Sequence, residues 1–62
     1  MADHERELLT LIEGTPEPQR HLEEFGREIG LSFDEVGSMV ERLEREGRLR
    51  WEGERLIVVG RG

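Results

Sequence analysis

Apolar residues recur at helical spacing in three segments of this chain, and the third segment shows the pattern most clearly. Four of its apolar residues fall at i, i+3, i+4 and i+7 and would line one face of a helix: Val36, Met39, Val40 and Leu43. Ser32 is suited to cap the start of this helix, and Glu35 would complete a capping box with it. Gly47 stands where a left-handed residue commonly ends a helix. The pattern predicts a helix over about residues 33–46.

A first helix is predicted over about residues 4–13. Asp3 can cap it, and its buried face would consist of Leu8, Leu11 and Ile12. Two prolines follow, and a residue before proline avoids the α-helical region, so we expect Thr15 and Glu17 to be extended. The segment between the first two helices is therefore expected to be a short extended linker.

A second helix is predicted over about residues 18–29. Pro18 suits its first position, where the missing N–H costs nothing, and its apolar stripe would be Leu22, Phe25 and Ile29. Gly26 lies inside this helix, where glycine costs about 1 kcal/mol relative to alanine, so we expect another helix to approach closely there. Only a short turn separates Ile29 from Ser32, which indicates a helix-turn-helix.

The period changes from helical to alternating beyond residue 47. Leu49 and Trp51 alternate with arginines, and a second apolar run follows a glycine-containing turn. The pattern predicts a β-hairpin over about residues 48–59. Two registers are open, because Leu49 would lie opposite Leu56 with a two-residue loop and opposite Ile57 with a three-residue loop.

The chain has 62 residues, which is the size of one domain with a small core. We expect a single α+β domain over residues 1–62, mainly α with a C-terminal β-hairpin, in which three helices pack as a bundle. The chain has no cysteine, and His4 and His21 stand on different predicted helices without a third ligand nearby. No metal site and no cofactor are therefore expected.

The chain contains no motif for an enzyme. It has no serine in a nucleophile motif and no glycine-rich loop after a strand, so we expect no catalytic residues and no small-molecule substrate. No apolar run is long enough to cross a membrane and no secretory leader is visible, so a cytoplasmic protein is expected. All nine basic residues are arginine, and lysine and asparagine are absent, which is typical of a thermophile-like composition.

Charge is distributed unevenly along the chain. The net charge is −6, which argues against a general binder of polyanions. Residues 1–41 hold three arginines and eleven acids, whereas residues 42–62 hold six arginines and four acids. The C-terminal third is therefore the only basic part of the chain.

The order of three helices and a hairpin resembles the winged-helix family over nearly the whole chain. The resemblance is carried by the segment 22–32, LEEFGREIGLS, and then by Val36, Val40, Leu43, Glu44, Gly47 and Leu49. The likeness is to the small winged helices of bacterial and archaeal regulators, and to those of some translation factors and iron-transport accessory proteins. It implies that the helix over about 33–46 is a recognition helix whose early exposed positions face the DNA major groove.

The early exposed positions of that helix depart from the family pattern. Asp34, Glu35 and Glu41 are carboxylates, which would repel phosphate. Ser38 and Arg42 are the ordinary candidates for nucleic-acid contact on this helix.

The basic residues around the hairpin are better candidates for contact. Four arginines could straddle a phosphate backbone or a minor groove: Arg45, Arg48, Arg50 and Arg55. An alternative applies to Arg42 and Arg45, which could belong to a solvated surface neutralised by the acids of their own helix. Glu41 stands four residues before Arg45, in the favourable order for such a pair.

Trp51 has two interpretations. Because it alternates with Leu49, it can pack the hairpin onto the helices, but an exposed Trp51 would anchor a partner or a nucleobase. Two functions follow. The first is a small nucleic-acid-binding protein of the transcription-regulator type that contacts DNA mainly through its basic wing. The second is an acidic protein–protein interaction module, or a homodimer, that binds no nucleic acid.

Overall fold

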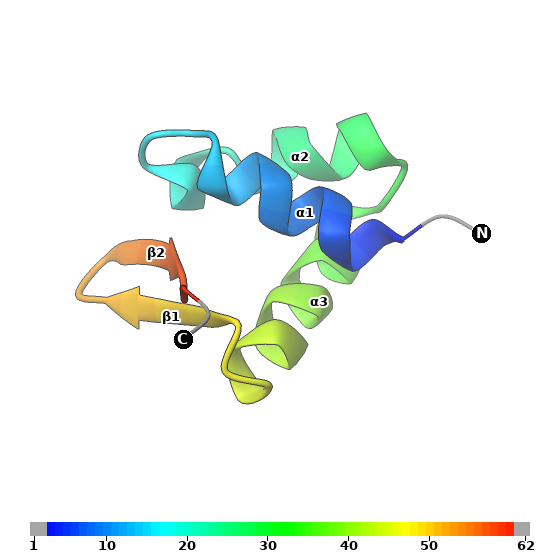
Figure 1. Cartoon of the computed structure of the whole chain (residues 1–62). Coiled ribbons are helices and arrows are strands. Elements are labelled where there is room, and N and C mark those ends of the chain that lie inside the picture. Colours follow the sequence, from blue (N-terminus) through cyan, green and yellow to red (C-terminus); the bar gives the residue numbers. More distant parts are fainter. Residues whose placement is uncertain (1–2, 61–62) are drawn as a thin grey trace.

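The computed structural model describes residues 3–60, and three α-helices followed by an antiparallel β-hairpin make up its fold (Figure 1). The helices and strands have these bounds: α1 (His4–Glu13), α2 (Leu22–Ile29), α3 (Phe33–Arg45), β1 (Leu49–Glu52) and β2 (Arg55–Val58), with a 3-10 helix, η1 (Pro18–Arg20), before α2. The predicted class, mainly helical α+β, is confirmed. Over the described residues, no helix has the length and apolar character needed to cross a membrane.

The first two helices form one layer, and α3 crosses beneath them (Figure 1). The hairpin lies to one side of the helices, with its loop pointing away from them. Buried apolar side chains from all three helices and both strands form a single core: Leu8, Ile12, Phe25, Val36, Val40, Leu43, Leu49 and Leu56. The remaining predicted stripe residues are half-buried and pack against it: Leu11, Leu22, Ile29 and Met39. This arrangement is compatible with a winged-helix shape.

The two predicted helix caps are present. The Asp3 carboxylate accepts a hydrogen bond from the backbone N–H of Arg6 at 3.1 Å at the start of α1. At α3, the Ser32 hydroxyl accepts from the Glu35 N–H at 3.2 Å, and the Glu35 carboxylate accepts from the Ser32 N–H at 2.8 Å. The predicted capping box is therefore formed. Gly47, just beyond α3, has the expected left-handed conformation, with φ of 79°.

The segment before α2 differs from the prediction in two ways. Glu17 is left-handed, with φ of 52° and ψ of 56°, and is not extended. The helix predicted from Pro18 begins only at Leu22, because Pro18 opens η1 instead. Pro18 is buried, and Gln19 Oε1 accepts from the Leu56 N–H at 3.2 Å, so the linker is held against β2. These tertiary contacts outweigh the local preference of a residue before proline.

The turn between α2 and α3 depends on a close approach at Gly26. Gly26 is buried, and Val36 of α3 and the backbone of Leu31 lie against it. The expectation that another helix approaches at this position is confirmed. The N–H of Leu31 also donates to the Gly26 carbonyl at 2.7 Å, so the chain folds back onto α2 before α3 begins.

The hairpin register matches neither of the two predicted pairings. Leu49 pairs with Val58, and a two-residue loop, Gly53–Glu54, joins the strands. Both expected registers placed Glu52 in the loop, whereas Glu52 pairs with Arg55 and lengthens the ladder. Only the first loop residue has a positive φ, of 63°, which is the pattern of a type II′ turn with glycine at its first position. A two-residue turn at residues 53–54 is therefore consistent with the register in which Glu52 and Arg55 form the last strand pair.

Candidate nucleic-acid interface

The exposed face of α3 is acidic at its start and mixed in charge toward its end. Four exposed residues lie opposite the buried stripe, at i, i+4, i+7 and i+11: Asp34, Ser38, Glu41 and Arg45. Ser38 and Arg42 also line one shallow groove, which reaches His4 at the start of α1. The charged residues of the first turn of α3 are therefore both acidic, whereas its last turn carries Arg42 and Arg45 with Glu44 between them.

Glu35 keeps its charge at the start of α3. The hydrogen bond from the Ser32 backbone N–H, followed by the interaction with the Ser32 hydroxyl, lowers the pKa of Glu35 below its ordinary value of 4.5. The carboxylate is held in the capping box and stays ionised at neutral pH. It would repel a phosphate brought to this end of the helix, so the N-terminal half of α3 is unfavourable to nucleic acid.

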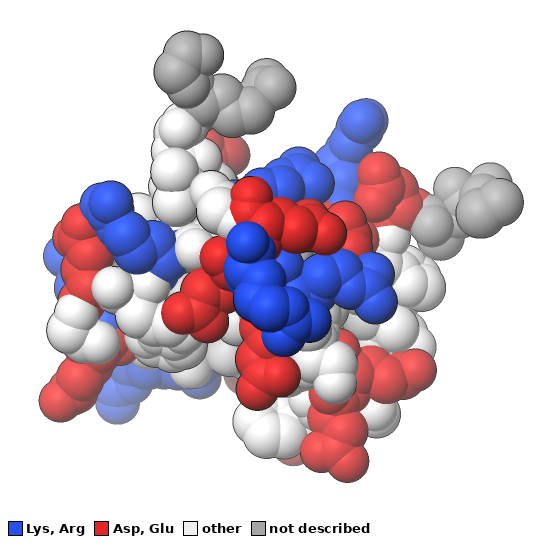
Figure 2. Space-filling model, turned by 90° about the horizontal axis from the view of Figure 1, so that it is seen from below, with Lys and Arg blue, Asp and Glu red and all other residues white. Residues whose placement is uncertain are grey.

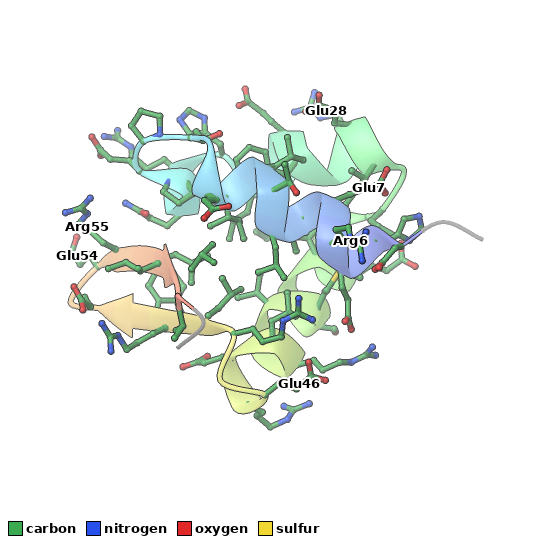
Figure 3. The ribbon with its side chains drawn as sticks, in the orientation of Figure 1. Arg6, Glu7, Glu28, Glu46, Glu54 and Arg55 are labelled. Atoms are coloured by element: carbon green, nitrogen blue, oxygen red, sulfur yellow. The ribbon has the colours of Figure 1, made fainter. Side chains whose placement is uncertain are left out.

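The hairpin turns its leucines toward the helices and two arginines away from them. Leu49 and Leu56 are buried, and the alternation along each strand places Arg50 and Arg55 on the opposite face. Figure 3 shows Arg55 close to Glu54 near the hairpin loop, and both residues border a shallow groove shared with Glu17 and Gln19. We call this surface the outer face of the hairpin, and its arginines are Arg50 and Arg55.

Arg42 and Arg48 converge on one carboxylate from α1. Arg42 Nη1 lies 3.0 Å from Glu5 Oε2, and Arg48 Nη1 lies 4.0 Å from Glu5 Oε1. Arg42 is thus neutralised by a carboxylate 37 positions away in the sequence and not by an acid of its own helix. Helical spacing gave no signal for this contact, because it depends on how α1 packs across α3.

The remaining candidate arginines differ from one another. Arg50 pairs with Glu52 on the same strand. Within residues 3–60, Arg45 and Arg55 have no carboxylate oxygen within 4.0 Å of their guanidinium nitrogens. The pair between Glu41 and Arg45 that the helical spacing allowed is therefore not formed.

Figure 2 shows the molecule from below, the side on which α3 and the hairpin lie in Figure 1. Arginines gather there in separate groups, with carboxylates between and beside them. The ion pairs of Glu5 and Glu52 account for part of this mixture. The positive charge is consequently broken into patches and does not form one continuous strip, which weakens its field at a distance.

Two aromatic side chains are exposed near these charges. Trp51 is 40% exposed, so Leu49 holds the hairpin onto the helices more completely than Trp51 does. Phe33, to which the sequence pattern gave no role, is 61% exposed. Its spacing from Val36 fits the buried stripe, but it is the first residue of α3 and lies beyond the end of the core. Its position directly after the Ser32 cap was the feature of the sequence that could have predicted its exposure.

The two histidines lie apart in the fold. His21 Nδ1 is 3.0 Å from Glu24 Oε1, within one turn of the chain, whereas His4 borders the groove along α3. In the part of the chain that the structure describes, no three His, Asp or Glu side chains are grouped so as to hold a metal ion.

A comparison of this chain with models of known protein families, with curated proteins and with solved structures finds no match. The fold itself provides α2 and α3 joined by a short turn, followed by an antiparallel hairpin that buries Leu49 and Leu56 and carries two arginines on its outer face. This arrangement is compatible with a helix-turn-helix and a wing.

Proposed function

We propose that this chain is a winged-helix protein of the transcription-regulator type and that it binds the phosphate backbone of DNA mainly through its hairpin. The observation that carries the proposal is the two-sided hairpin. Leu49 and Leu56 are buried on its inner face, so Arg50 and Arg55 are directed to solvent on its outer face. Arg45, in the last turn of α3, adds a third positive charge shortly before β1 begins.

The carboxylates near these arginines limit the affinity without excluding binding. An exposed ion pair contributes only about 0–1 kcal/mol, so a phosphate can replace Glu52 beside Arg50 at small cost. The acidic start of α3 disfavours its insertion into the major groove. We therefore propose weak binding with little sequence preference and a dissociation constant on the order of 1–100 µM.

Fluorescence anisotropy with a labelled mixed-sequence duplex tests this proposal. Three phosphate contacts, from Arg45, Arg50 and Arg55, would give a slope of about −2.7 for the logarithm of the association constant against that of the salt concentration. The double variant Arg50→Gln/Arg55→Gln should reduce that slope to about −0.9. A labelled single strand, titrated in parallel, tests whether the duplex is preferred.

The matched control is Arg20→Gln/Arg27→Gln, which removes the same charge from η1 and α2 and leaves the outer face of the hairpin unchanged. We expect this control to keep the wild-type slope. Absence of binding by the wild type at tens of micromolar in low salt would exclude the proposed function. Equal losses in the two double variants would exclude the hairpin as the contact surface.

A second function, docking to a protein partner or to a second copy of the chain, is favoured by Phe33. This side chain is 61% exposed and stands beside Asp34 and Glu35, where a helix that reads DNA would carry donors. An aromatic residue beside acids suits an apolar and basic protein surface. Light scattering during size exclusion at high concentration tests the homodimer, and Phe33→Ser should abolish any dimer found.

A further inference from the structure

Glu5 lies between two arginines that come from different parts of the fold. It belongs to the first turn of α1, Arg42 belongs to α3, and Arg48 lies just before β1. Its two carboxylate oxygens approach different guanidinium groups, at 3.0 Å and 4.0 Å. The Glu5 side chain is 26% exposed, whereas those of Arg42 and Arg48 are 59% and 49% exposed. The arginines therefore remain open to solvent around the carboxylate.

Two guanidinium groups that converge on one carboxylate also suit a phosphate group. Arginine presents its N–H donors in a planar fork that matches the oxygens of either anion. We propose that Arg42 and Arg48 form a phosphate clamp that Glu5 occupies in the free protein, and that the clamp binds a backbone phosphate of nucleic acid when Glu5 is displaced. This inference rests on the proposed function, and it assigns to Glu5 the role of setting the affinity.

The competition between Glu5 and a phosphate is closely balanced. Each ion pair of Glu5 joins it to a guanidinium group that is about half exposed or more, and such pairs are weak, so displacement of Glu5 costs little. Glu5 is nevertheless tethered beside the clamp by α1, which gives it a high effective concentration relative to a free anion. Nucleic acid held nearby by the hairpin would share this advantage, because its phosphates would also be tethered. Whether Glu5 or a phosphate occupies Arg42 and Arg48 determines how many phosphates the protein contacts.

Substitution of Glu5 distinguishes two roles for its ion pairs. They either occupy a phosphate-binding clamp or only join α1 to α3. Glu5→Gln removes the competing charge, and Glu5→Asp shortens the side chain while it keeps the net charge of the protein. Glu7 stands two residues after Glu5 and is exposed. It lies on the side of α1 next to α2 (Figure 3). Glu7→Gln and Glu7→Asp are therefore the matched controls for overall charge and for side-chain length.

Anisotropy titrations of the labelled duplex over a series of salt concentrations give the decisive readout. With Arg42 and Arg48 released, two further phosphate contacts should steepen the salt slope of Glu5→Gln by about 1.8. The affinity at low salt should rise on the order of tenfold or more. Glu5→Asp should move in the same direction, whereas Glu7→Gln and Glu7→Asp should keep the wild-type slope. In the triple variant Glu5→Gln/Arg42→Gln/Arg48→Gln the gain should be lost.

The outcomes distinguish the clamp from the proposed function. If the wild type binds and Glu5→Gln behaves as Glu7→Gln does, the clamp is wrong and the proposed function stands. If no variant binds the duplex, the proposed function fails. Inorganic phosphate, titrated into ¹⁵N-labelled Glu5→Gln, then tests the clamp alone. Shifts of the Arg42 and Arg48 Nε–H signals support it, and unchanged signals overturn it. Thermal unfolding checks that each variant is folded.

Discussion

Gly26 in α2 and Val36 in α3 lie so close together that a β-carbon on Gly26 would be 2.7 Å from Val36 Cγ2. The same β-carbon would be 2.8 Å from the carbonyl oxygen of Leu31. That oxygen belongs to the backbone and cannot move aside unless the whole turn shifts. Gly26 therefore determines how closely α2 and α3 approach each other.

We expect Gly26→Ala to lower the free energy of unfolding by about 1–3 kcal/mol, because an added carbon in a packed contact displaces its neighbours. At an exposed helical site the same change raises the free energy of unfolding by about 1 kcal/mol. The sign of the effect therefore reports the contact. Urea denaturation followed by circular dichroism measures it.

Gly37 provides the matched control for this substitution, because it lies inside α3 and a β-carbon on it would meet no atom within 4 Å. Gly37→Ala should raise the free energy of unfolding by about 1 kcal/mol. Stabilisation by both substitutions would show that α2 and α3 are not in close contact at Gly26.

The hairpin register predicts different effects for two neighbouring residues of β2. Leu56 is buried in the core, whereas Ile57 lies on the outer face and is half-buried. Leu56→Ala should lower the free energy of unfolding by about 2–5 kcal/mol, and Ile57→Ala should lower it clearly less. Thermal unfolding of the two variants compares these effects. A larger loss for Ile57→Ala would mean that the strand is turned the other way.

Gln19 connects η1 to β2 through its side chain. In Gln19→Ala the Leu56 N–H loses its acceptor, so the free energy of unfolding should fall by about 0.5–1.5 kcal/mol. Exchange of the Leu56 amide hydrogen, measured by NMR, should become faster. Gln19→Glu keeps an oxygen acceptor and should preserve the protection. Unchanged exchange in Gln19→Ala would contradict the contact.

The lowered pKa of Glu35 should make the stability of the protein depend on pH. Its pKa is lowered in the folded state by the hydrogen bond from the Ser32 N–H, so its ionised form stabilises the fold above the ordinary pKa of 4.5. This contribution is lost as the pH falls through the lowered pKa. Glu35→Gln keeps an acceptor but cannot titrate. The advantage of the wild type over Glu35→Gln in urea denaturation should therefore shrink as the pH falls below about 4.5. An advantage that is independent of pH would contradict the capping role.

The features that the sequence predicted correctly depend on neighbours along the chain. The capping box of Ser32 and Glu35 involves residues three positions apart, and the buried stripe of α3 follows from helical spacing. Both features depend only on residues that lie within one or two helical turns of each other. The close approach at Gly26 could be predicted because glycine inside a helix needs a compensating reason.

The features that the sequence did not predict depend on contacts between distant segments. The left-handed Glu17 and the separate η1 follow from packing against β2, where Gln19 meets the Leu56 N–H. The hairpin register depends on one further strand pair that local alternation leaves undecided. The Glu5 ion pairs require α1 to lie across α3, whereas from the sequence the only partners considered for Arg42 were the acids of its own helix.

An ¹⁵N NMR titration with a short unlabelled duplex directly locates the surface at which nucleic acid contacts the protein. We predict that the largest shifts fall on Arg45 and on the outer face of the hairpin, at Arg50 and Arg55, while the amides around Phe33 and those of α2 stay unchanged. Shifts confined to the start of α3, or no shifts at all at low salt and high protein concentration, would contradict this prediction.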